Sequence, residues 1–227
     1  MQGASASSCR NRSAPASPCR PLLRGWLRSL YGRTVTPLAN RRVRWEKVRN
    51  VLFVAHPDDE LLFFSGQLQQ RDRQWLVVAM SGGDRPTRAG EFRRAARAFG
   101  AQALLLNLPD GQDVRWEPAV LDARIAAVLR RVPRLEAVYT HNREGEYGHA
   151  QHIQLHAAVL RQCPAGKTFV PLTDDLLFTP EHRLPDDASQ HKLAFFSAHY
   201  PSQAVILTHK NQYFQYEGWR KADTHGA

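Results

Sequence analysis

The sequence is poor in cysteine, in methionine and in long apolar runs, and its first fifty residues are nearly devoid of acidic side chains. The three cysteines, Cys9, Cys19 and Cys163, have neither the spacing of a metal site nor the number of a disulfide framework, which is typical of a reducing compartment. No apolar run approaches the roughly 18 residues that cross a bilayer, and the start lacks the apolar core of a secretory signal. We therefore expect a cytoplasmic protein.

The shortage of acids near the start accounts for the net charge of +10. Residues 1–50 contain 11 Lys or Arg and a single acid, Glu46, whereas residues 51–227 contain 20 residues of each sign. The excess charge therefore belongs to the N-terminal segment and says little about a site elsewhere. The length of 227 residues allows one α/β domain with a substantial core.

The N-terminal segment has two parts. Residues 1–20, which are rich in Ser, Ala, Pro and Arg and lack periodicity, predict a disordered basic tail. Residues 21–48 form a basic amphipathic segment, in which 21–33 place apolar and arginine side chains on separate helical stripes. Such a helix fits packing on the domain, or peripheral contact with the anionic inner face of the cytoplasmic membrane. Specific nucleic-acid binding is disfavoured, because no nucleic-acid fold is recognisable.

From residue 49 to residue 227, short apolar runs alternate with helical patterns. The runs that predict strands are 51–55, 75–80, 103–106, 135–140 and 169–172. The patterns that predict helices are 60–71, 87–99, 116–132, 149–160 and 188–199. This alternation predicts an α/β domain with a Rossmann-like, mostly parallel sheet flanked by helices, and an active site at the carboxyl ends of the strands.

The strand expected at 51–55 runs directly into the sequence HPDDE, one imidazole and three carboxylates at 56–60. A buried strand end cannot hold this charge without a partner, and a divalent metal is the partner we favour. One of the two aspartates can bind the metal while its neighbour takes a proton from water, as metal-dependent hydrolysis requires. A turn into a capped helix is the alternative. Glu60 is expected to be a helix-start carboxylate.

A second polar cluster, HNREGEYGHAQH at 141–152, follows the strand expected at 135–140. His149 and His152 lie three residues apart in the first turn of a helix, so they share a face beside its positive end. His156 is more simply explained as a packed or exposed helix histidine. Two histidines and one aspartate with an open fourth position suit a catalytic zinc, and Fe2+ is the alternative metal for such a site.

Both clusters resemble a known family. HPDDE at 56–60 resembles the signature of the PIG-L/LmbE family of zinc-dependent de-N-acetylases, and YGHAQH at 147–152 is similar to its second motif, G-H-x-x-H. The resemblance extends from about residue 51 to about residue 200. Many members have Pro-Asp between the two histidines, where this chain has Ala150-Gln151. Gln151 can form hydrogen bonds but carries no charge, which bears on the tuning of His149.

The resemblance implies roles for seven residues. They are His56, Asp59 and His152 as zinc ligands, Asp58 as general base, His149 and Tyr147 at the oxyanion, and Arg88 in substrate binding. It also implies the reaction, in which zinc-activated water removes the N-acetyl group from a GlcNAc-like amino sugar, lipid-linked or part of another glycoconjugate. A non-catalytic carbohydrate- or lipid-binding protein that retains the fold is the alternative function.

Overall fold

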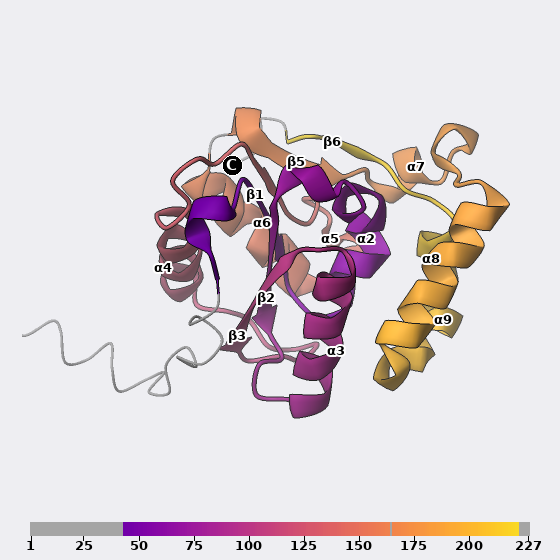
Figure 1. Ribbon diagram of the computed structural model, residues 1–227, viewed down its shortest axis with the longest axis horizontal. Helices are drawn as coiled ribbons and strands as arrows, with labels where there is room; N and C mark the ends of the chain where they lie inside the picture. The colour runs from indigo at the N-terminus through magenta and orange to yellow at the C-terminus, as the bar shows by residue number, and fades with distance from the viewer. Residues whose placement is uncertain (1–42, 164, 223–227) are drawn as a thin grey trace, which may run out of the picture. The chain divides into compact units, whose positions relative to one another are not determined.

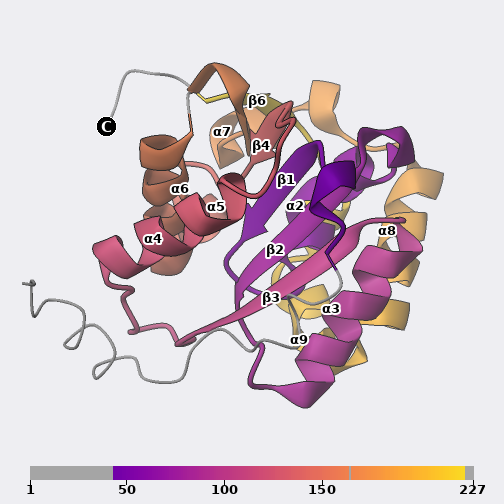
Figure 2. The ribbon, with the colours of Figure 1, turned by 60° about the vertical axis from the view of Figure 1, so that its left-hand side comes forward.

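The computed structural model describes residues 43–163 and 165–222, so the segments predicted at 1–20 and 21–33 lie outside the described residues. The described part is a six-stranded sheet with helices on both faces (Figures 1 and 2). The strand order is β3-β2-β1-β4-β5-β6. The first five strands along the chain pair in parallel and β6 is antiparallel to β5, which confirms the predicted fold class.

The first five strands along the chain coincide with the apolar runs of the sequence. Their bounds are β1 Asn50–Val54, β2 Trp75–Ser81, β3 Gln102–Leu108, β4 Ala137–Tyr139, β5 Thr168–Pro171 and β6 Trp219–Lys221. Every residue of β1 and β2 is buried, because both faces of the sheet are covered. Leu52 and Val54 pack into the core on one face, whereas Val51 and Phe53 pack into the core on the other.

Two layers of helices sandwich the sheet, as Figure 2 shows. The larger helices are α2 Asp59–Leu68, α3 Pro86–Ala98, α4 Pro118–Leu129, α6 Ala150–Gln162 and α8 Asp186–His199. Helices α2, α3 and α8 contribute to the core on one face, and α4 and α6 contribute to the core on the other. The shorter elements used below are α5 Gly145–Gly148, η7 Pro201–Gln203, α9 Ala204–His209 and η8 Asn211–Phe214.

Two local differences from the sequence expectation have physical causes. The helix predicted at 116–132 begins only at Pro118, a residue favoured at a helix start. Trp116 instead lies in the preceding loop, where its indole Nε1 donates to the carbonyl of Pro109 at 2.7 Å. The short strand β6 was not predicted, because its three half-exposed or exposed residues form no apolar run.

The strand order determines where the polar clusters meet. Strand β1 has β2 on one side and β4 on the other, so the chain reverses its direction of winding between β1 and β4. Connections after two such strands leave toward opposite faces and open a crevice at their carboxyl ends. Residues 56–60 follow β1 and residues 141–152 follow β4, so this crevice collects both clusters.

Candidate metal centre

The HPDDE segment forms a tight turn between β1 and α2. Asp58 is the N-cap of α2, and its carbonyl accepts hydrogen bonds from the amides of Leu61 and Leu62. The backbone amide of His56 donates to Asp59 Oδ2 at 2.8 Å. Glu60 lies in the first turn of α2, as the sequence predicted, and is fully buried.

The second cluster folds back on itself after β4. Glu146 has a left-handed backbone with a φ of 57°. Its side chain is held by the amide of Asn142, which donates to Oε1 at 2.9 Å, while the Asn142 side chain accepts from the Glu146 amide at 3.0 Å. His149 is the N-cap of α6, and its Nδ1 accepts a hydrogen bond from the amide of Gln151. This fold-back buries the Glu146 carboxylate beside the imidazoles.

Three side-chain atoms from the two clusters form a nearly equilateral triangle. His56 Nδ1 lies 3.4 Å from Asp59 Oδ2 and 3.3 Å from His152 Nε2, and His152 Nε2 lies 3.4 Å from Asp59 Oδ2. Ligand atoms bound tetrahedrally at roughly 2.0–2.1 Å lie about 3.3–3.4 Å from one another. The triangle therefore has the dimensions of one face of a tetrahedral zinc site.

Hydrogen bonds fix which imidazole nitrogens face this triangle. His152 Nδ1 lies 2.7 Å from Glu146 Oε2, and His56 Nε2 lies 2.7 Å from Gln151 Oε1. Both oxygens only accept hydrogen bonds, so these ring nitrogens carry the hydrogen. The other nitrogen of each ring then presents a lone pair to the triangle, as a metal ligand must.

His141 lies beside the triangle but uses both of its nitrogens elsewhere. Asp59, His141 and His152 form one group of potential ligand atoms within 4.8 Å of one another. However, His141 Nε2 accepts from the amide of Ala55 at 3.0 Å, and Nδ1 lies 2.9 Å from Glu146 Oε2. His141 therefore supports the site by anchoring the end of β1 and the Glu146 carboxylate.

A second group of potential ligand atoms consists of His56, His149 and His152. Burial, followed by the charge of His56, lowers the pKa of His149, so its ring is neutral near neutral pH. Since Nδ1 accepts from the Gln151 amide, the hydrogen of the neutral ring lies on Nε2. His149 is thereby suited to donate a hydrogen bond to an oxygen in the site.

The carboxylates of the cluster favour positive charge at its centre. Burial lowers the pKa of His152 to about 4, with a further contribution from His141, which leaves a neutral imidazole. Burial acts in the same direction on His56, but the carboxylates of Asp110 and Asp59 outweigh it and raise the pKa of His56 to about 10. A metal cation between these carboxylates would take the place of the proton.

Asp58 lies outside the triangle and contacts Arg88. Its Oδ2 is 2.6 Å from Arg88 Nη2, which also donates to the carbonyl of Pro57 at 2.5 Å. Burial raises the pKa of Asp58 well above its usual range, although the charge of Arg88 opposes this shift. The predicted base and the predicted substrate-binding residue are therefore direct partners, and contact between Arg88 and substrate stays a prediction.

The site opens into a pocket of about 190 Å³. Six of the seven predicted site residues line it, namely His56, Asp58, Asp59, Arg88, Tyr147 and His149. The seventh, His152, is fully buried. The C-terminal part of the chain contributes Gln203, Ile206 and Lys210, and the Lys210 ammonium lies 3.3 Å from the centre of the Tyr147 ring. The sequence carried no motif that marked these last three residues.

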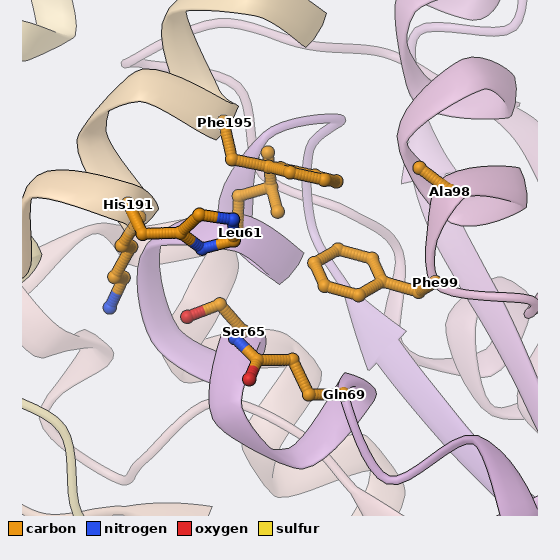
Figure 3. Close-up of a pocket in the computed structure, with 8 residues that line it drawn as sticks. Leu61, Ser65, Gln69, Ala98, Phe99, His191 and Phe195 are labelled. Atoms are coloured by element: carbon orange, nitrogen blue, oxygen red, sulfur yellow. The ribbon is translucent and has the colours of Figure 1, made fainter. Parts of the chain in front are cut away.

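A larger cavity of about 290 Å³ lies away from this site, between α2, α3 and α8. Figure 3 shows the Phe99 ring on one side and His191 on the other, with Ser65 from α2 below them. The buried polar groups of this cavity, the Ser65 hydroxyl and the Lys192 ammonium, are both bound to Glu217. The cavity therefore offers mainly apolar walls, and the acid–base chemistry lies in the smaller pocket.

The side chain of Gln151 contacts a different histidine from the one considered in the sequence. It bonds His56 and the carbonyl of Pro109, whereas only its backbone amide contacts His149. A carboxylate is nevertheless present, because Asp110 Oδ1 lies 3.3 Å from His56 Nε2. The signal for Asp110 was the Pro-Asp-Gly turn at 109–111, just after the third strand.

Comparisons with known proteins identify the family to which this chain belongs. The model of the family described as PIG-L, GlcNAc-PI de-N-acetylase, matches residues 51–163. N-acetylglucosaminyl-phosphatidylinositol de-N-acetylase of Bos taurus is 30% identical over 135 residues, which cover 52% of this chain and 52% of the relative. The chain belongs to the PIG-L family, as its two motifs predicted.

Two further proteins resemble this chain. Uncharacterized protein L374 of Acanthamoeba polyphaga mimivirus is 28% identical over 144 residues, which cover 56% of this chain and 62% of the relative. N,N'-diacetylchitobiose deacetylase from Pyrococcus horikoshii superposes with a TM-score of 0.54 at 14% identity, covering 90% of this chain and 94% of the other. The chain thus spans between half and two thirds of the two curated relatives, and the solved structure establishes a shared fold.

Within residues 43–163 and 165–222, none of the helices combines the length and the apolar composition that a membrane crossing requires.

Proposed function

We propose that this protein is a metal-dependent hydrolase that removes the N-acetyl group from a GlcNAc-like amino sugar. The observation that carries the proposal is the triangle of His56 Nδ1, Asp59 Oδ2 and His152 Nε2, with edges of 3.3–3.4 Å. Two imidazoles and one carboxylate with an open fourth position are a donor set typical of catalytic zinc. Membership of the PIG-L family supports the choice of an N-acetylated sugar as substrate.

The triangle residues would hold the cation, and Glu146, Gln151 and Asp110 would hold the two imidazoles. When bound, zinc supplies a Lewis acid that polarises a carbonyl and lowers the pKa of water. Ferrous iron would fit the same mixed donor set.

Asp58 is proposed as the general base. It is adjacent to Asp59 in the chain, lines the same pocket, and has a raised pKa because it is buried. A carboxylate with a raised pKa accepts a proton from water more readily than a solvated one, and it can then return the proton to the leaving amine. The Arg88 guanidinium keeps the carboxylate in place.

Tyr147 and His149 are proposed to stabilise the negative oxygen that develops on the acetamide carbon. His149 is neutral near neutral pH, with Nε2–H as its available donor. Burial raises the pKa of Tyr147, so its hydroxyl keeps its hydrogen and can donate it. Preformed donors of this kind commonly account for a large part of the rate enhancement in acyl transfer.

The test is acetate release by the purified full chain from a panel of N-acetylhexosamines, including free N-acetylglucosamine and a lipid-linked conjugate. We expect acetate release that a chelator abolishes and that added zinc restores. Sugar binding without acetate release in the metal-loaded protein would instead support the non-catalytic carbohydrate-binding protein. Acetate release from the lipid-linked conjugate would extend the proposal to the membrane contact expected for residues 21–33.

A further inference from the structure

Asp58 has a backbone conformation that aspartate adopts only under constraint. Its φ is 112° and its ψ is −30°, in a region that glycine occupies readily and other residues avoid. Such a conformation costs about 1–3 kcal/mol and persists only where the surroundings determine it. The segment must therefore contain groups that hold Asp58 in this conformation.

Contacts on its side chain and on its backbone hold Asp58, and the backbone contacts include the hydrogen bonds from the Leu61 and Leu62 amides to its carbonyl. Arg88 binds the carboxylate. The Asp58 amide donates to Glu60 Oε2 at 3.0 Å, two residues further along the chain. The direction of this N–H depends on the rotation about φ, so the Glu60 carboxylate acts on the strained torsion itself.

The Glu60 carboxylate is in turn held by Tyr200. The Tyr200 hydroxyl donates to Glu60 Oε1, the oxygen that does not contact Asp58. Both side chains are fully buried, so water does not compete for these bonds. Burial, reinforced by the charge of Glu60, raises the pKa of Tyr200, which keeps its hydroxyl protonated as the donor.

Tyr200 belongs to a part of the chain remote in sequence from both motifs. It is the C-cap of α8, and its amide donates to the carbonyl of Phe196. The next turn is fixed as well, since Ser202 donates its amide and hydroxyl to the two oxygens of Glu91 at 3.0 and 2.5 Å. The end of α8 is thus anchored firmly enough to act as a fixed point for Glu60.

We propose that Glu60 and Tyr200 are positioning residues that hold the backbone of Asp58 so that its carboxylate faces the reacting water. This rests on the proposed function of Asp58 as the base. Neither residue lines the pocket, so both act through Asp58 and not on the substrate. The end of α8 thereby takes part in the chemistry of a site whose motifs lie at 56–60 and 141–152.

The decisive variant is Tyr200→Phe, which removes the hydroxyl and keeps the packed ring. We expect kcat for N-acetylglucosamine to fall on the order of tenfold, with KM and zinc content unchanged. A crystal structure of the variant should show Asp58 outside the positive-φ region or in more than one conformation. Tyr139→Phe is the matched control, because Tyr139 is equally buried and its hydroxyl binds Arg73. We expect this control to keep the wild-type kcat.

Glu60 offers a rescue experiment. In Glu60→Gln the amide oxygen can accept from the Asp58 amide while the amide nitrogen donates to the Tyr200 oxygen, so the bridge and most of kcat should survive. Glu60→Met has a similar shape but no acceptor, so kcat should fall at least as far as in Tyr200→Phe.

The structural readout separates this inference from the proposed function. If the wild-type protein releases no acetate, the proposed function fails, yet the Asp58 conformation in Tyr200→Phe still tests the positioning role. An unchanged positive φ at Asp58 in Tyr200→Phe would overturn the inference, as would a variant that loses activity only by losing its metal.

Discussion

The carboxylate of Glu146 lies 2.7 Å from Nδ1 of His152. The same oxygen lies 2.9 Å from Nδ1 of His141, so one buried carboxylate serves two imidazoles. Burial alone would raise the pKa of Glu146, but the neighbouring His141 and the hydrogen bonds from both rings lower it to about 2. Glu146 therefore stays ionised, and it determines which nitrogen of His152 faces Asp59 and His56.

This relationship predicts the effect of Glu146→Gln. The amide has no charge and only one acceptor oxygen, so it cannot accept from the two imidazoles on one side and from the Asn142 amide on the other. We expect zinc affinity, measured by competition with a chromogenic chelator, to weaken about 10- to 100-fold. Glu144→Gln is the control, because its side chain is half exposed and pairs with the exposed Arg143, away from the imidazoles. Equal zinc affinity in the two variants would remove Glu146 from the support of the metal.

Asp58→Asn tests the proposed base. The substitution keeps the size of the side chain but removes its ability to accept a proton. We expect zinc content to be retained while kcat for acetate release falls by about 10²- to 10⁴-fold. Asp187→Asn, at an exposed position on α8, should keep the wild-type rate. Wild-type turnover in Asp58→Asn would transfer the role of base to another residue.

Lys192 on α8 provides a prediction about stability that does not depend on the reaction. Its buried ammonium donates to the carbonyls of Leu62 and Tyr213, each at 2.8 Å, and lies 3.5 Å from Glu217 Oε1. Lys192→Met leaves the buried Glu217 without this partner, which should lower the free energy of unfolding by about 3–5 kcal/mol. Urea unfolding measures the change. Lys221→Met, at an exposed position, should stay within about 0.5 kcal/mol of wild type.

The same lysine predicts a dependence of stability on pH. Burial lowers the pKa of Lys192, and Glu217 offsets this only in part. Between the lowered folded-state pKa and the unfolded value of about 10.4, the unfolded chain binds more protons than the folded one. The contribution of Lys192 to the free energy of unfolding therefore rises as pH increases through this window. The difference between wild type and Lys192→Met should grow with pH, and a difference that shrinks would contradict the assignment.

Much of the fold could be predicted because both faces of the sheet are covered. Full burial gave β1 and β2 uninterrupted apolar runs, which ended at the HPDDE segment after β1 and at the Ser-Gly-Gly segment of 81–83 at the end of β2. The helix start at Pro118 and the strand β6 were not predicted, because they depend on tertiary contacts. The carbonyl of Pro109 binds the Trp116 indole outside the helix, and β6 needs β5 as a partner.

The site residues could be predicted only where several of them lie close together in the sequence and form a motif. HPDDE and YGHAQH each carry their polar residues within a few positions, so their chemical types are visible in the sequence. Lys210 lines the pocket and Tyr200 contacts Glu60 behind it, but both lie outside either motif, and nothing in the sequence around them marks a role. The part played by Glu146 depends on its left-handed backbone, which the sequence around it does not reveal.

The most direct test of the metal centre is anomalous diffraction from zinc-loaded crystals, collected on both sides of the zinc absorption edge. If zinc binds at this triangle, we expect one strong peak in the anomalous difference map, about 2.0–2.2 Å from His56 Nδ1, Asp59 Oδ2 and His152 Nε2. The peak should be absent from His152→Ala crystals and present in His156→Ala crystals, because His156 instead binds the carbonyl of His141. A fully active protein with no peak at this triangle would contradict the account.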